Sequence, residues 1–234
     1  MIPRHHIETA ARLSRDIYRD LDAFRDTADL YGVEIGAWFD HGDTQAALCR
    51  GRDYAAAYLV FRGTQPRIHQ LQDVLTNLAV YPSRWAGAGR AHAGYVAALG
   101  RVRYQARLMA ERVASSIPLY VAGHSMGGAL ATLYADWVSA DVPDRHRLAG
   151  LITFGAPAAA TMEAHRPMLE RMPVERFVMP GDLARLWPPV LFRHPGPARR
   201  LAPISWWPGP LSRHDMGDYA LSLCTEPSQT KDGG

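Results

Sequence analysis

One pentapeptide of this chain could do chemistry by itself. Gly123-His124-Ser125-Met126-Gly127 has the G-x-S-x-G spacing, in which a serine sits at a sharp strand-to-helix turn and its hydroxyl can act as a nucleophile. The glycines two residues before and after the serine would relieve the crowding of such a turn. Because the spacing also occurs in ordinary glycine-rich loops, the flanking residues decide how it is interpreted.

The flanks of the pentapeptide have the patterns that this turn needs. Ile117–Ala122 is a short apolar run, typical of a strand buried on both faces of a parallel sheet. From Met126 onward, apolar residues recur at steps of three and four, which indicates a helix. We therefore expect Ser125 to project from the strand end toward solvent, with the helix N-terminus behind it.

A nucleophilic serine also needs an acid and a base, and with this turn the chain order is serine, then Asp or Glu, then His. The acid has to follow a strand. Asp182 does so, because Pro180 and Gly181 separate it from the expected strand Val174–Met179. Four other downstream acids sit in or beside expected helices: Asp141, Asp144, Glu163 and Glu170.

The base has to come from the histidines that follow Ser125. His146 and His165 stand among charged residues, and we expect both to be solvated. His214 stands just before the last expected helix, where a loop-borne imidazole could reach the C-terminal edge of the sheet. His194 remains the alternative base on this reasoning.

The elements that must position these residues alternate between strands and helices, which predicts an α/β fold with a central, mostly parallel sheet and helices on both faces. An amphipathic helix is expected to run from about Ile7 to Phe24. The expected strands are Val33–Phe39, Ala46–Cys49, Ala55–Phe61, Ile117–Ala122, Leu151–Phe154 and Val174–Met179. The other expected helices are Gly94–Ser115, the one after Ser125, Met162–Met172 and His214–Leu223.

Composition is typical of one enzyme domain. With 234 residues, of which 47% are hydrophobic, the chain can bury one substantial core, expected over residues 1–224. The polar residues 225–234 are expected to form a disordered tail. The net charge is +3, and the Lys and Arg residues are interspersed with acidic residues and form no dense basic block. This pattern argues against nucleic acid as a partner. Cys49 and Cys224 have no metal-ligand spacing; two reduced thiols are expected, with one bridge as the alternative.

Targeting and membrane signals are sparse. No apolar run approaches the roughly 18 residues that span a bilayer, so no transmembrane segment is expected. Met1–Leu13 contains no apolar core of a secretory signal. A cytoplasmic location is therefore the default expectation, and export by a non-Sec route stays open.

Short motifs follow one another along the chain in a fixed order. They are Val60-Phe61-Arg62-Gly63-Thr64, His92-Ala93-Gly94-Tyr95, the pentapeptide with its helix, Thr153-Phe154-Gly155-Ala156-Pro157, Gly181-Asp182-Leu183-Ala184-Arg185, Phe192-Arg193-His194-Pro195-Gly196 and His214-Asp215-Met216. In these motifs, the segment from about Tyr54 to Leu223 resembles the class 3 lipases of the α/β-hydrolase fold, which are typified by triacylglycerol lipases of filamentous fungi.

The resemblance implies roles for the candidate residues. Ser125 would be the nucleophile, Asp182 the acid and His214 the base, whereas His194 falls in an aromatic-x-His-x-Gly strand and would be structural. The implied chemistry is acyl transfer from an ester to water through an acyl-enzyme.

Two further features concern the oxyanion and the substrate. The backbone N–H of Met126, next to the nucleophile, would be one oxyanion donor, and the resemblance points to Thr64 for the second. The family places a lid after Thr64. Here residues 65–72 offer only Ile68 and Leu71 as apolar lid positions, so the short polar lid is more similar to those of esterases or phospholipases.

The resemblance therefore implies a carboxylic ester hydrolase similar to triacylglycerol lipases, acting on acylglycerols or similar lipidic esters at a lipid–water interface. No cofactor and no metal are expected. The alternatives are a phospholipase or acyltransferase with the same triad, and a catalytically silent lipid-binding relative.

Overall fold

The structure is a computed structural model that describes residues 1–42, 44–53, 55–63, 81–113, 115–141, 148–184, 191–203 and 214–225. In chain order its elements are α1 (Arg4–Asp16), α2 (Leu21–Leu30), β1 (Val33–His41), β2 (Thr44–Gly51), β3 (Ala57–Phe61), β4 (Pro82–Trp85), β5 (Gly89–His92), α4 (Ala93–Gly100), α5 (Arg103–Ala110), β6 (Leu119–His124), α6 (Met126–Asp141), β7 (Leu148–Phe154), α7 (Met162–Leu169), β8 (Val174–Val178), β9 (Arg199–Arg200) and α8 (Met216–Thr225).

The central sheet is mostly parallel, as the sequence predicts. Its described strands are ordered β1-β2-β3-β6-β7-β8-β9, and β4 and β5 form a separate hairpin. The pairs β1–β2 and β2–β3 are antiparallel, whereas β3, β6, β7, β8 and β9 pair in parallel. The central strands β3 and β6 are buried along their whole length, as expected for strands covered on both faces.

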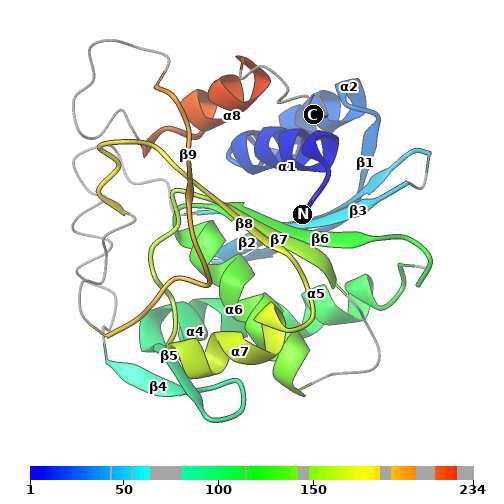
Figure 1. Cartoon of the computed structure of the whole chain (residues 1–234). Coiled ribbons are helices and arrows are strands. Elements are labelled where there is room, and N and C mark those ends of the chain that lie inside the picture. Colours follow the sequence, from blue (N-terminus) through cyan, green and yellow to red (C-terminus); the bar gives the residue numbers. More distant parts are fainter. Residues whose placement is uncertain are drawn as a thin grey trace, which may run out of the picture.

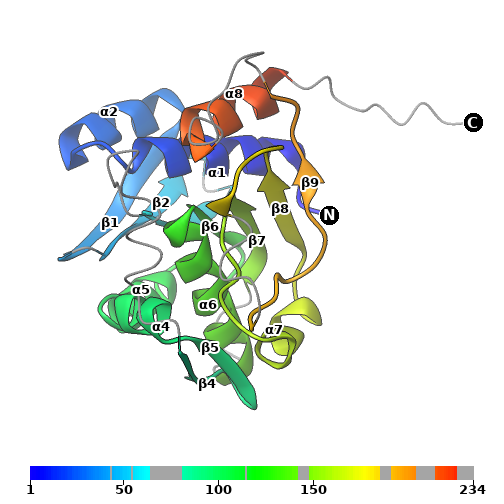
Figure 2. The same ribbon diagram turned by 90° about the vertical axis from the view of Figure 1, so that its left-hand side faces the viewer.

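Helices cover both faces of the sheet (Figure 1), which confirms the expected layering. On one face lie α1, α2 and α8 (Figure 2), and α1 contacts both of the other helices. On the opposite face lie α4, α5, α6 and α7. Alternate residues of β3 enter the two cores: Tyr58 and Val60 pack toward α1 and α8, whereas Leu59 and Phe61 pack toward α6.

The expected single helix from Ile7 to Phe24 is wrong, because the chain forms two helices there. Helix α1 ends at Asp16, and α2 begins after Asp20, whose side chain accepts a hydrogen bond from the backbone N–H of Ala23 at 2.9 Å. An aspartate in this N-cap position starts a new helix. The apolar periodicity continues across the break, which is why the sequence pattern hides it.

The expected helix Gly94–Ser115 is also two helices. Helix α4 ends at Gly100 and α5 begins at Arg103, with Val102 between them at φ −123° and ψ −17°. Glycine and valine are both weaker helix formers than alanine or leucine, so the break falls where propensity is lowest. The hairpin of β4 and β5 was not expected from the sequence.

Three further expectations concern the cysteines, the C-terminal tail and membrane-spanning segments. Cys49 is buried and Cys224 exposed, and both are free thiols, so they do not form the alternative bridge. Helix α8 ends at Thr225, and residues 226–234 of the expected tail lie outside the described residues. Among the helices that the structure describes, none is long and apolar enough to cross a bilayer.

His92, at the end of β5, is a buried imidazole without hydrogen bonds among the described residues. Its ring stacks on Tyr95, with 4.1 Å between the ring centroids. Neither ring nitrogen has a hydrogen-bond partner in that part of the chain. Burial lowers the pKa of His92 to about 4, because the charged form cannot be solvated there.

This low pKa predicts a loss of stability in acid. Between the ordinary histidine pKa of about 6.5 and about 4, the unfolded chain binds a proton that folded His92 does not, so the free energy of unfolding falls as pH falls. We expect His92→Phe to lose less stability than wild type between pH ~7 and ~4.5, by on the order of 2 kcal/mol. Urea unfolding at the two pH values measures this difference. His41→Phe, at an exposed position, is the control, and equal losses in wild type and His92→Phe would refute the prediction.

Candidate active site

The pentapeptide forms the sharp turn between β6 and α6. Ser125 has a positive φ of +56°, in the left-handed region that residues with a side chain rarely occupy. A Cβ on Gly123 would lie 2.4 Å from the backbone of Gly127, and a Cβ on Gly127 would lie 2.2 Å from the carbonyl oxygen of Phe61. Both glycines are therefore required by the close approach of the turn to itself and to β3.

The expectation that Ser125 projects into solvent is wrong. Only 2% of the residue is exposed. Its hydroxyl is directed instead at His214, whose ring is also buried, so the nucleophile lies beneath the molecular surface.

Three residues from separate parts of the chain meet at this turn. His214 Nε2 lies 2.7 Å from Ser125 Oγ, and His214 Nδ1 lies 2.9 Å from each carboxylate oxygen of Asp182. Ser125 follows β6, Asp182 follows β8 and His214 precedes α8. The structure thus brings together the three residues that the sequence singled out, in the order needed for proton transfer from the serine.

The carboxylate of Asp182 is held by further donors. The hydroxyl of Tyr219 donates to Oδ2 at 2.7 Å, and the backbone N–H of Ala184 donates to Oδ1 at 2.9 Å. The backbone N–H of Met179 in turn donates to the Tyr219 oxygen at 3.0 Å. Gly155, at φ +53°, leaves the space that this carboxylate needs, because a Cβ there would lie 2.6 Å from Oδ2.

A second imidazole, His124, packs against the first. The ring centroids of His124 and His214 are 4.7 Å apart, and His124 Nδ1 lies 2.9 Å from the hydroxyl of Tyr18. Burial, reinforced by the nearby His214, holds the pKa of His124 well below its usual range. His124 is therefore neutral, so it does not repel a positive charge that forms on His214.

Sequence reasoning missed these supporting residues. Tyr219 lies on the buried side of α8, and Tyr18 follows α1, but their partners are remote in sequence. The one available signal was the position of His124 next to the nucleophile. Nothing in its spacing indicates that it packs on the base.

His165, which the sequence suggested was solvated, is instead fully buried. Its Nδ1 lies 2.9 Å from Oδ2 of the buried Asp136, and its Nε2 donates to the carbonyl of Arg193 at 3.1 Å. Burial alone would lower the pKa of His165, but the Asp136 carboxylate outweighs it and raises the pKa. The pair joins α6 and α7 to the 191–203 segment, so its role is structural.

The remaining candidate residues have different positions. His194 is half-buried in the segment after β8, and its carbonyl accepts the N–H of Gly196 at 2.9 Å; the histidine that contacts Ser125 is His214. Met126 begins α6 directly after the nucleophile. Thr64, Ile68 and Leu71 lie outside the described residues. No group of three His, Cys, Asp or Glu side chains within the described ranges could hold a metal ion.

A mostly parallel sheet with helices on both faces, and a serine at the strand–helix turn bonded to a histidine and an aspartate, define a protein of the α/β-hydrolase class. The family is equally clear. Residues 58–191, more than half of the chain, match the family Lipase (class 3), and the chain belongs to that family.

Two known proteins of similar sequence are named as lipases. The lipases of Rhizopus niveus and Rhizopus oryzae are each 27% identical to this chain over 198 residues, which cover 81% of this chain and 46% of the relative. The chain thus spans about half the length of these relatives.

Solved structures show the same fold at lower sequence identity. The triacylglyceride lipase of Rhizomucor miehei superposes with a TM-score of 0.69 at 21% identity, over 84% of this chain and 79% of that one. The lipase of Rhizopus microsporus var. chinensis gives 0.67 at 19% identity, over 84% and 72%. A triacylglycerol lipase described as having a serine protease triad as its catalytic centre gives 0.67 at 21%, over 84% and 78%. The expected α/β-hydrolase fold is confirmed.

The positive φ of Ser125 predicts a stability difference between two variants that both lack the hydroxyl. Ser125→Gly relieves the backbone strain, whereas Ser125→Ala retains it. We expect Ser125→Gly to have the larger free energy of unfolding, by about 1 kcal/mol. Urea unfolding of both proteins measures the difference. A less stable glycine variant would contradict the left-handed backbone at this position.

Proposed function

We propose that this protein is a serine carboxylester hydrolase that cleaves acylglycerols or similar lipidic esters. The observation that carries the proposal is the 2.7 Å contact between His214 Nε2 and Ser125 Oγ in a chain of the class 3 lipase family. Asp182 on the other ring nitrogen completes the set of groups that an activated serine needs.

The proposed reaction has two halves. As Ser125 Oγ bonds to the ester carbonyl carbon, its proton passes to His214 Nε2, while Asp182 orients the ring and stabilises its positive charge. The bond to the alcohol then breaks, and the alcohol leaves with the proton from His214. In the second half, water attacks the acyl-enzyme and gives a proton to His214. The carboxylic acid is released and Ser125 recovers its hydrogen.

The oxyanion formed in each half needs donors that are already in place. We propose the backbone N–H of Met126, at the start of α6, as one donor, with Thr64 as the second. Gly63, the residue before Thr64, supports this choice, because a Cβ on it would lie 3.3 Å from Ser125 Cβ. Losing one such donor costs about 3 kcal/mol of transition-state stabilisation.

The substrate class follows from the relatives and from the surroundings of the triad. The similar proteins include a triacylglyceride lipase and a triacylglycerol lipase. The described residues that hydrogen-bond to Asp182 or pack on His214 are uncharged, including the neutral His124. A neutral ester therefore suits the site better than a phospholipid, whose headgroup contains a charged phosphate. We propose that Ile68 and Leu71 contact the lipid surface as a short lid.

The triad assignment predicts the activity of single variants. Ser125→Ala and His214→Ala are each expected to lose at least about four orders of magnitude in kcat for a soluble p-nitrophenyl ester, because each removes a group that transfers the proton. Asp182→Asn is expected to lose a similar amount, because its amide favours the wrong tautomer of His214.

His194→Ala is the matched control for the base, and it should keep activity within a few-fold of wild type. If His194→Ala were inactive and His214→Ala active, the assignment of the base would be wrong. Wild-type activity no higher than that of Ser125→Ala would leave a lipid-binding relative as the function.

The substrate class predicts a preference between two lipid surfaces. Titration of released fatty acid should show at least about tenfold faster hydrolysis of a triacylglycerol emulsion than of phosphatidylcholine vesicles of equal surface area. A tenfold ratio of rates corresponds to about 1.4 kcal/mol of discrimination between the two substrates. Ser125→Ala sets the background for both surfaces. Faster release from the vesicles would identify the alternative function, a phospholipase.

A further inference from the structure

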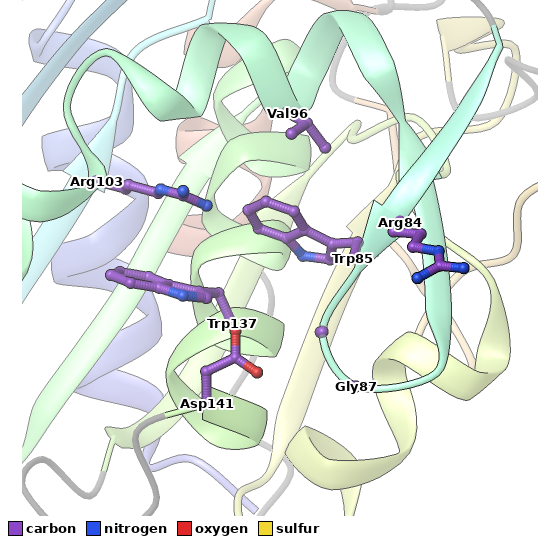
Figure 3. Close-up of a pocket in the computed structure, with 8 residues that line it drawn as sticks. Arg84, Trp85, Gly87, Val96, Arg103, Trp137 and Asp141 are labelled. Carbon is purple, nitrogen blue, oxygen red and sulfur yellow. The ribbon is translucent and has the colours of Figure 1, made fainter.

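A pocket of about 450 Å³ opens far from Ser125, on the side of the molecule where the β4–β5 hairpin lies (Figure 3). Its walls come from the hairpin turn, from α4, from the start of α5 and from the C-terminal end of α6. Ser125 immediately precedes α6, whereas Trp137 and Asp141 in the pocket belong to the last turns of that helix. At 1.5 Å per residue, roughly 20 Å separate the pocket from the nucleophile. The pocket is therefore a separate site.

Arg103 dominates the chemistry of this pocket. Its guanidinium carbon lies 5.4 Å from the ring centre of Trp85, 5.1 Å from that of Trp137 and 4.6 Å from that of Tyr104. Figure 3 shows the side chain reaching toward the two indole rings. Nη2 donates to the hydroxyl of Tyr104 at 3.0 Å. The rings hold the guanidinium in one orientation, so an anion that binds it does not have to order a mobile side chain.

None of the described residues forms a direct ion pair with this guanidinium. Within the described part of the chain, the Nε of Arg103 is buried without a hydrogen-bond partner. Its cation–π contacts are with Trp85, Tyr104 and Trp137, and its side-chain hydrogen bond is to the Tyr104 hydroxyl. An arginine placed in this way offers its remaining N–H groups to a ligand.

The charges around the pocket favour one negative charge on a ligand. Arg84 and Arg103 contribute two positive charges to the lining, and Asp141 contributes one negative charge. The C-terminal end of α6 adds a partial negative charge beside Asp141. A monoanion matches this balance, whereas a phosphate dianion would be repelled by Asp141 and by the helix end.

The remaining walls are apolar. Trp85 and Trp137 are each 6% exposed, and Val96 is half-buried beside them. The volume lies within the range of small-molecule sites, about 300–1,000 Å³. A planar carboxylate accepts two parallel hydrogen bonds from a guanidinium, and a hydrocarbon chain attached to it would cover the indole and valine surfaces.

We propose that this pocket binds an organic carboxylate that carries a short apolar chain, with Arg103 as the anion partner and Trp85, Trp137 and Val96 as the walls. The site is independent of the hydrolysis at Ser125. Asp141 sets its selectivity by excluding ligands with more than one negative charge.

Binding of octanoate tests the proposal, with the indole N–H resonances of the full-length protein as the site-specific readout. Trp85→Phe and Trp137→Phe identify the two resonances that belong to the pocket. We expect octanoate to shift both resonances in a saturable way at low millimolar concentration. Octanamide, which has the same chain without the charge, is expected to bind at least about tenfold more weakly.

Variants separate this site from any other that binds octanoate. Arg103→Met keeps the apolar stem and should weaken binding at least about tenfold. Arg101→Met, at an exposed arginine just before α5, is the matched control and should leave it unchanged. Asp141→Asn removes the opposing charge and should tighten binding about two- to fivefold.

Several results would overturn the proposal. They are unsaturated or absent shifts of the Trp85 and Trp137 resonances, equal affinity for octanoate and octanamide, and weaker binding in Asp141→Asn. Inorganic phosphate that bound as tightly as octanoate would also refute it, because the apolar walls would then contribute nothing. If Arg103→Met fails to fold, the comparison of octanoate with octanamide on wild type and Asp141→Asn still decides.

Discussion

The left-handed backbone at Ser125 is the constraint on which the site depends. For a residue with a side chain this conformation is unfavourable in free energy. At Ser125 the hydrogen bonds around the turn hold the backbone in it. The backbone N–H of Ser125 donates a hydrogen bond to the carbonyl of Phe154 on β7 at 3.0 Å. The carbonyl of Ser125 accepts hydrogen bonds from the backbone N–H groups of Gly128 and Ala129 in α6. The turn is thus bonded on one side to the sheet and on the other to α6.

Parallel strands make this arrangement productive. Because β6, β7 and β8 run in the same direction, the segments that follow their carboxyl ends meet at one edge of the sheet. Ser125, Gly155 and Asp182 each follow one of these strands directly or within a few residues. The sheet therefore supplies the nucleophile, the space for the acid and the acid itself, and only the base has to come from elsewhere.

The parts of the site that could be predicted are those governed by local spacing or by chain order. Ser125 was found from its motif and Asp182 from the order in which such residues must follow it. That order left His194 and His214 as possible bases, and only the resemblance to the class 3 lipases favoured His214. Tyr219 and Tyr18 could not be found in this way, because their partners lie 37 and 106 residues away and no spacing relates them. His165 was misjudged for the same reason: its charged neighbours in sequence say nothing about the buried Asp136 on another helix. The mostly parallel sheet with helices on both faces followed from the alternation of strands and helices. The helix breaks at Asp20 and Val102 depended on a cap and on local propensity that a continuous apolar pattern concealed.

The packing of α1 on α8 also has a consequence for the order in which the site is assembled. Arg4 on α1 donates to the carbonyl of Leu223 on α8 at 2.8 Å, so the first and last described helices lie together on one face of the sheet. A ribosome delivers the chain from its N-terminus, so the strand–helix turn with Ser125 emerges long before His214 does. During synthesis the serine has no base, and the proposed hydrolytic chemistry stays off until α8 closes over α1. The timing of activity is thereby linked to the completion of the fold.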